Sequence, residues 1–315
     1  MTNSTATVLD DLAAIRTELR DSGEPSAQLL RLDPALPLLD IASDWAVIAL
    51  AALACTLISP WLFPLAVLLV GNRQRSLGNI LHDGSHWNLH RQREVNDTIA
   101  RVLIAPLLFV DLDQYRGDHF RHHAQLGDPA GDPDLLAPRC GAGQGWLNHY
   151  AAHVLDKRRW WDSVASHLGQ RGTSWSSRLT IVAWWIALAA AIDAAGGVAL
   201  LCMFMLLWLL ARATAFHLIT TFREMCDHFG MKPGGVCSFT RDIVTEGPWA
   251  WLLHPRNNGL HLTHHLLPTV PYYRLRQAQR LLSRLPTYRS HSPTRASYVF
   301  GRSAVVAGWA RGAAQ

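Results

Sequence analysis

The chain has 315 residues, of which 49% are hydrophobic and only 17% are charged, whereas about a quarter of a typical soluble domain is charged. This deficit indicates that much of the surface faces something other than water. The net charge of +5 is scattered through the polar segments and forms no concentrated basic stripe, so we expect no nucleic-acid partner. The five cysteines form no CxxC pair, which argues against a disulfide framework or a thiolate zinc site.

Residues 1–44 are polar to amphipathic and are predicted to form an N-terminal cytoplasmic segment. Leu9, Leu12, Ile15 and Leu19 fall at helical spacing, which indicates a peripheral helix or, alternatively, ordinary packing of this stripe against the domain. The segment lacks the charged start and apolar core of a signal peptide, so export is not expected.

Two apolar regions predict an all-α integral membrane fold with four transmembrane helices in two hairpins. Residues 45–70 are too many for one upright span and too few for two, because a bilayer needs about 20 residues per helix. We therefore expect a turn near Ser59–Pro60 and a second helix that continues into residues 71–86. Residues 179–195 and 197–221 form a second apolar pair around a glycine turn.

The placement of basic residues predicts the orientation of these hairpins. Neither hairpin turn contains Lys or Arg, whereas the long segments after each pair are rich in Arg and contain one Lys each. The positive-inside rule therefore places both long segments and both termini in the cytoplasm, where they would form a helical cap. The expected division is an N-terminal segment 1–44, a membrane domain 45–290 and a C-terminal tail 291–315.

Three histidine clusters carry the strongest chemical signal. Residues at positions i, i+3 and i+4 share one helix face, so each cluster can direct its imidazoles at one point. Imidazole binds iron, zinc, copper and nickel, and eight histidines exceed the roughly four ligands that one zinc ion takes. The pattern predicts a site for two metal ions. The clusters are His82 and His86; His119, His122 and His123; and His261, His264 and His265.

Redox iron fits this ligand set better than zinc does. The clusters contain no cysteine and no HExxH general base, and the chain lacks the Glu-based ligand pattern of soluble di-iron bundles. A zinc-dependent membrane hydrolase or a metal carrier is the alternative of another class. A hydrolase would leave five histidines unexplained, and a carrier should place polar ligands at the bilayer midplane.

Arg212 and His217 are expected to line a substrate entrance or to reach the interface. Histidines outside the clusters, such as His149, His153 and His254, are expected to lie at the surface or interface.

Three segments resemble the membrane fatty acid desaturase and hydroxylase superfamily, in particular its bacterial fatty acid desaturases, over residues 45–290. They are GNRQRSLGNILHDGSH, YRGDHFRHH followed by DPD, and HLTHHLLPTVPYYRL. The resemblance implies two iron ions, O2 as co-substrate and desaturation of a fatty-acyl or lipid-like chain at the bacterial inner membrane. Hydroxylation or decarboxylation on the same scaffold remains an alternative. The resemblance also implies a separate electron donor, which would be a ferredoxin, a rubredoxin or a cytochrome b5 with its reductase.

The resemblance further implies ligands outside the clusters. Arg223 to His228 is similar to the family's Arg-x-x-x-Glu-His element, with Asp227 in place of Glu, and makes His228 a ninth ligand; a surface histidine is the alternative. Asn257 would hold a metal-bound water, unless it is a plain turn asparagine. Carboxylates near the ligands are expected to accept hydrogen bonds from their distal ring nitrogens, and solvated loop positions are the alternative. These outer groups are Asp83, Asp118, Asp132, Asp134 and Asp227, with Arg223.

Overall fold

The computed structural model describes residues 4–23, 26–141, 143–291, 294–301 and 303–309. Within these ranges every regular element is helical, and extended pairing is limited to isolated bridges. The chain divides into two compact units that alternate along the sequence. Unit 1 comprises Met1–Leu32, Arg116–His153 and Thr221–Gln315, and unit 2 comprises Asp33–Tyr115 and Val154–Thr220.

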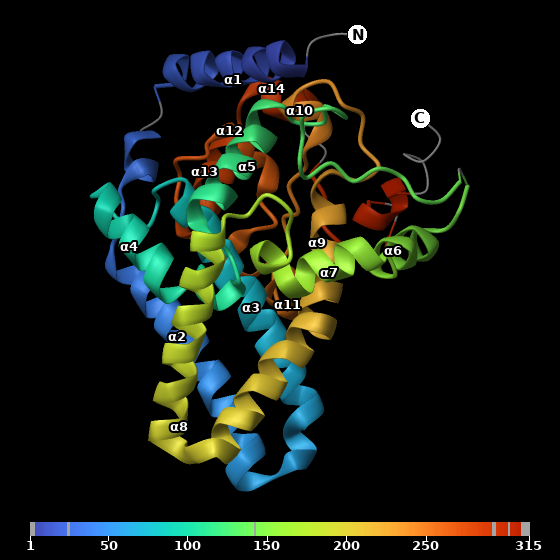
Figure 1. Ribbon diagram of the computed structural model, residues 1–315. Coiled ribbons are helices and arrows are strands. Elements are labelled where there is room, and N and C mark those ends of the chain that lie inside the picture. Colours follow the sequence, from blue (N-terminus) through green and yellow to red (C-terminus); the bar gives the residue numbers. More distant parts are fainter. Residues whose placement is uncertain (1–3, 24–25, 142, 292–293, 302, 310–315) are drawn as a thin grey trace. The chain divides into compact units, whose positions relative to one another are not determined.

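Unit 2 is built on long helices that run side by side (Figure 1). Its elements are α2 (Ala35–Leu53), α3 (Phe63–Ser85), α4 (Arg93–Leu103), α7 (Lys157–Ala165) and α8 (Trp175–Ala211). The first hairpin turns where predicted, because Ser59 is extended (φ −162°, ψ 129°) before Pro60, as the residue before a proline prefers. The next helix then continues as far as Ser85.

The second hairpin is also confirmed. Gly197 interrupts α8 with φ 76° and ψ 174°, a conformation that only glycine adopts readily, and thereby separates two helical rods. The second rod continues through a π-helical turn at Arg212–Phe216 into α9 (His217–His228). Both hairpin turns lie at the same end of unit 2 (Figure 1).

Two helical stretches of the described chain, Ala35–Ile58 and Trp175–His228, are long and apolar enough to cross a membrane. Large apolar side chains are exposed along them, which is typical of a surface that meets another apolar phase. Examples are Leu50, Leu57, Ile58, Leu179, Ile186 and Leu206.

A buried polar network explains how the polar start of the 71–86 region can lie among apolar helices. Asp44 on α2 accepts hydrogen bonds from Arg73 Nη1 at 2.9 Å and from Ser76 Oγ at 2.6 Å. Gln74 Nε2 donates to the carbonyl of Trp208 on α8 at 2.9 Å. The network joins three of the helical rods, and a buried charge is tolerated when it is paired in this way.

Arg212 and His217 serve the packing of unit 2. Arg212 is buried and donates to the carbonyls of Val164 and Leu108, both at 2.8 Å. His217 is also buried, and its Nδ1 lies 2.8 Å from Ser163 Oγ. Both side chains therefore hold neighbouring segments against the last rod, in place of the predicted entrance or interface role.

Unit 1 contains the larger part of α5 (Leu112–Ala124) and the C-terminal part of α9. Its other helices are α1 (Ser4–Asp21), α6 (Trp146–Val154), α10 (Val236–Phe239), α11 (Pro248–Leu253), α12 (His261–Leu266), α13 (Leu275–Leu282) and α14 (Pro286–His291). The N-terminal helix packs on the domain through Val8, Ile15 and Leu19, whereas Leu9 is 60% exposed.

The described part of the predicted C-terminal tail belongs to the core of unit 1. Tyr298, Val305 and Trp309 are buried in a cluster with Phe222 and Phe229 of the α9 region. Residues 292–293, 302 and 310–315 of that tail lie outside the described residues.

We expect Asp44→Ala to destabilise the protein by about 3–5 kcal/mol, because it leaves the Arg73 guanidinium buried without its carboxylate. Unfolding of the purified protein by a denaturing detergent would measure the change. The exposed Asp193→Ala is the control and should have almost no effect. The double replacement Asp44→Leu with Arg73→Met should recover much of the loss; equal losses in Asp44→Ala and Asp193→Ala would contradict this account.

Candidate metal site

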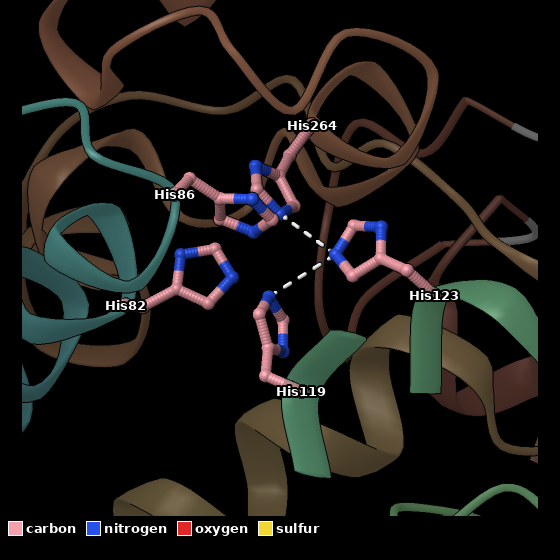
Figure 2. Close-up of side chains that lie close together, drawn as sticks. All are labelled: His82, His86, His119, His123 and His264. Atoms are coloured by element: carbon pink, nitrogen blue, oxygen red, sulfur yellow. Dashed lines mark hydrogen bonds between the residues drawn. The ribbon is translucent and has the colours of Figure 1, made fainter. Parts of the chain in front are cut away.

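The second histidine cluster lies on α5, where helical spacing brings its imidazoles to one side. His123 Nε2 lies 3.1 Å from His119 Nε2 and 3.1 Å from His264 Nε2 of α12. Figure 2 shows the three rings converging around these two contacts. Both the second and the third cluster therefore contribute to one group of ring nitrogens in unit 1.

A second group in unit 1 consists of four buried histidines. The ligand atoms of His122, His228, His261 and His265 all lie within 4.8 Å of one another. His261 Nε2 lies 3.0 Å from His228 Nε2 and 3.1 Å from His265 Nε2. The helix α12 thus supplies ring nitrogens to both groups, and His228 lies among the cluster histidines.

Hydrogen bonds on the far side of two rings fix which nitrogen faces this group. His122 Nδ1 donates to Asp132 Oδ1 at 2.7 Å, and His228 Nδ1 donates to the carbonyl of Phe239 at 2.9 Å. In a neutral imidazole the other nitrogen then carries a lone pair. Lone pairs directed into one small buried space repel each other, and a cation among them would remove that repulsion. The donor set therefore fits a metal ion.

The protonation states of His261 and His265 agree with this interpretation. Burial and the neighbouring imidazoles hold the pKa of His261 and of His265 well below the usual range, so both rings are neutral near pH 7, as metal ligands must be. Burial also acts to lower the pKa of His122, but its hydrogen bond to Asp132 and the nearby carboxylates outweigh burial and raise that pKa.

Asp132 is itself held in place by the backbone. Its Oδ2 accepts the N–H of Gly127 at 2.8 Å and its Oδ1 accepts the N–H of Asp134 at 2.9 Å. The buried carboxylate is therefore rigid and can orient the His122 ring. Among the other predicted carboxylates that flank the second cluster, Asp134 is an exposed residue and Asp118 pairs with Arg121 on the same helix.

Asp227 lies between three groups. Its Oδ2 is 2.8 Å from Arg223 Nη2 and 3.7 Å from His261 Nε2. Its Oδ1 is 3.7 Å from His254 Nε2, and all four side chains are buried. The Arg223–Asp227 pair is thus next to the ligand group, beyond hydrogen-bond reach of His261.

His254 was placed wrongly from the sequence, since it is buried and its Nδ1 lies 2.9 Å from the Tyr298 hydroxyl. His149 and His153 are also buried, against the ring of Phe229. The apolar run WLL directly before His254 is the only local signal of its burial. A surface position was expected because these contacts form only in the tertiary structure.

Both polar atoms of the Asn257 side-chain amide form hydrogen bonds. Its Nδ2 donates to the carbonyl of Tyr272 at 3.0 Å, and its Oδ1 accepts from Arg276 Nε at 2.8 Å. These bonds tie the left-handed turn at Asn257 (φ 58°) to the start of α13. Its role toward a metal-bound water stays a prediction.

The first cluster is described within unit 2. His82 and His86 lie at the C-terminal end of α3, with their ring centroids 5.4 Å apart. His82 Nδ1 is 3.8 Å from Asp83 Oδ1, beyond hydrogen-bond distance. The spacing i, i+4 has brought these two rings together, as expected.

Comparison with known proteins supports an oxidative enzyme. A sequence model of the fatty acid desaturase family matches residues 58–297, a range that includes all three histidine clusters. The chain is also similar to dihydrorhizobitoxine desaturase of Bradyrhizobium elkanii, with 30% identity over an alignment 285 residues long that covers 82% of this chain and 78% of that protein.

We expect Asp132→Asn to weaken metal binding by the His122 group about 10- to 100-fold, the usual effect of removing the carboxylate behind a ligating histidine. A metal titration of the metal-free protein would measure the change. Asp118→Asn is the matched control, because this aspartate also lies close to the second histidine cluster in the sequence but pairs with Arg121. An equal loss in both variants would show that the Asp132–His122 bond is not the cause.

Proposed function

Because the chain belongs to the fatty acid desaturase family, we propose that it is a membrane di-iron enzyme that uses O2 to desaturate a fatty-acyl or lipid-like chain. Membership in the family makes the protein an oxidoreductase. The observation that carries the proposal is the group of four buried histidines in unit 1, in which burial favours neutral rings at His261 and His265 and hydrogen bonds fix the orientation of His122 and His228.

Each iron would have its own group of ligands. His122, His228, His261 and His265 would hold one ion, with His228 as the ninth ligand of the set. His119, His123 and His264 would hold the other together with His82 and His86 of the first cluster. The short distances inside unit 1 and inside the His82–His86 pair support this division.

The two irons would supply the reduction of O2 and the removal of hydrogen from an unactivated C–H bond. In the net reaction, –CH2–CH2– with O2, two electrons and two protons gives –CH=CH– and two waters. The protein would contribute ring orientation, through Asp132 and the Phe239 carbonyl, and a buried site that excludes bulk water. The two electrons would come from a separate ferredoxin, rubredoxin or cytochrome b5 with its reductase.

The membrane arrangement is part of the same proposal. The rods α2 and α3 and the two halves of α8 would span the bilayer of the bacterial inner membrane. The hairpin turns carry no Lys or Arg and lie at one end of unit 2, so this end would face the outside. The histidine-bearing end of α3 and both termini would then be cytoplasmic.

The choice of desaturation rests on the relative that the chain resembles. That protein is named a desaturase, and its name gives dihydrorhizobitoxine as its substrate. A fatty-acyl or lipid-like chain is the substrate class we propose here. Hydroxylation of the same substrate is the second candidate, since it needs the same ligands.

We expect anaerobically purified protein to contain two iron ions per chain, because the histidines form two ligand groups. Cells that express it should convert a membrane lipid, only in the presence of O2, into a product lighter by two hydrogen atoms. Metal analysis and mass spectrometry of lipids would check both expectations, with His264→Ala as the inactive comparison.

A product heavier by one oxygen atom would instead establish the hydroxylase. Protein that contains one zinc ion, and is active with zinc but not with iron, would overturn the redox proposal in favour of a hydrolase.

For the orientation, single cysteines would be introduced at Asp193 and at Arg139 in a background without native cysteines. A membrane-impermeant thiol reagent added outside spheroplasts should label position 193 and not position 139, because the turn at Gly197 would be external. After lysis both positions should be labelled. Labelling of position 139 in intact spheroplasts would reverse the proposed topology.

A further inference from the structure

The segment Phe239–Asp242 contacts both the helix that carries His228 and the helix that carries the third histidine cluster. At its first residue, the Phe239 carbonyl accepts His228 Nδ1–H at 2.9 Å. At its last residue, the buried Asp242 carboxylate contacts α12. All of these residues belong to unit 1, and none of the sequence patterns pointed to the last two residues of the segment.

Asp242 makes three hydrogen bonds with its two oxygens. Oδ1 accepts the backbone N–H of Thr263 at 3.0 Å, and Oδ2 accepts the Thr263 hydroxyl at 2.5 Å and the Tyr288 hydroxyl at 2.6 Å. Thr263 lies inside the third cluster, between His261 and His264. The carboxylate therefore connects the middle of the third histidine cluster to α14, the helix that carries Tyr288.

The helix α12 needs such external support. It has six residues, far fewer than an isolated helix requires to be stable, and its first N–H groups have no partner within the helix. Two consecutive residues of the segment supply those partners. The Arg241 carbonyl accepts the Leu262 N–H at 3.2 Å, and Asp242 accepts the Thr263 N–H.

Arg241 links the segment to the other ligand helix. Its buried guanidinium donates to the carbonyl of Phe229, directly after His228, and its Nε lies 3.0 Å from Met231 Sδ. Neighbouring residues thus reach the end of α9 and the start of α12. A shift of the segment would move the ligands of both helices together.

We propose that Phe239–Asp242 is a positioning element for the metal ligands and that Asp242, acting through α12, sets the affinity for both metal ions. The inference rests on the proposed di-iron function. The helix gives His261 and His265 to one group and His264 to the other, so loss of its support should affect both ions. The ligand to which Asp132 is hydrogen-bonded is His122, a member of one group, so Asp132 should affect one ion.

The test uses full-length protein in detergent, stripped of metal and titrated with Co(II), whose visible absorption reports the coordination of each ion. Asp242→Asn keeps the size of the side chain but removes its charge and one acceptor. We expect both Co(II) equivalents to bind about 10- to 100-fold more weakly, with a changed spectrum at saturation. Tyr288→Phe should give a smaller change of the same kind.

Glu18→Gln is the matched control. Glu18 accepts the N–H and the hydroxyl of Thr287, so it supports the short helix α14 as Asp242 supports α12, and within the described residues these hydrogen bonds reach neither α9 nor α12. We expect this variant to lose thermal stability to a similar degree while it binds both Co(II) ions with unchanged affinity and spectrum.

Three outcomes overturn the inference: unchanged affinity in Asp242→Asn, weakening of only one Co(II) equivalent, or equal weakening in Glu18→Gln. If Asp242→Asn does not fold, Thr263→Val decides, since it removes only the hydroxyl contact and should weaken both sites. Wild-type protein that fails to bind two Co(II) ions would refute the di-iron proposal itself, whereas two tight sites in every variant would refute only the role of Asp242.

Discussion

The electrostatic repulsion among ring nitrogens is the constraint on which the described site depends. In unit 1, His261 Nε2 has two other Nε2 atoms at 3.0 and 3.1 Å. Such contacts are unfavourable for neutral rings in a buried space unless a proton or a cation lies among them. The fold must therefore hold these rings against their mutual repulsion before any metal binds, and much of the surrounding structure provides that restraint.

The restraint comes from hydrogen-bond acceptors that contact a histidine ring, or the helix that carries it, on the side facing away from the ligand group. Asp132 and the Phe239 carbonyl each bind a ring Nδ1–H, and Asp242 holds the short helix α12. The two carboxylates are fixed in turn, Asp132 by two backbone N–H groups and Asp242 by Tyr288. The site is thus preorganised by second contacts that are themselves satisfied, as preorganised metal sites require.

The sequence was sufficient for features that depend on local spacing. The two hairpins followed from the length of the apolar runs with Pro60 and Gly197 as turn signals, and the histidine clusters followed from helical periodicity. Features that depend on tertiary contacts were not accessible in this way. His254 is buried because Tyr298, more than forty residues away along the chain, covers it, and Asp242 has a role only because α12 and α14 fold next to it. A carboxylate after Arg241 has no local pattern that distinguishes it from a loop residue.

The alternation of the two units along the chain has a consequence for biosynthesis. Unit 1 is assembled from three separate stretches, and its core includes Trp309 close to the end of the described chain. The parts of unit 1 that are synthesised first therefore keep apolar surface exposed while unit 2 and the last stretch are still being synthesised. Both ligand groups include histidines of the third cluster, so neither group can be complete before that cluster has been synthesised.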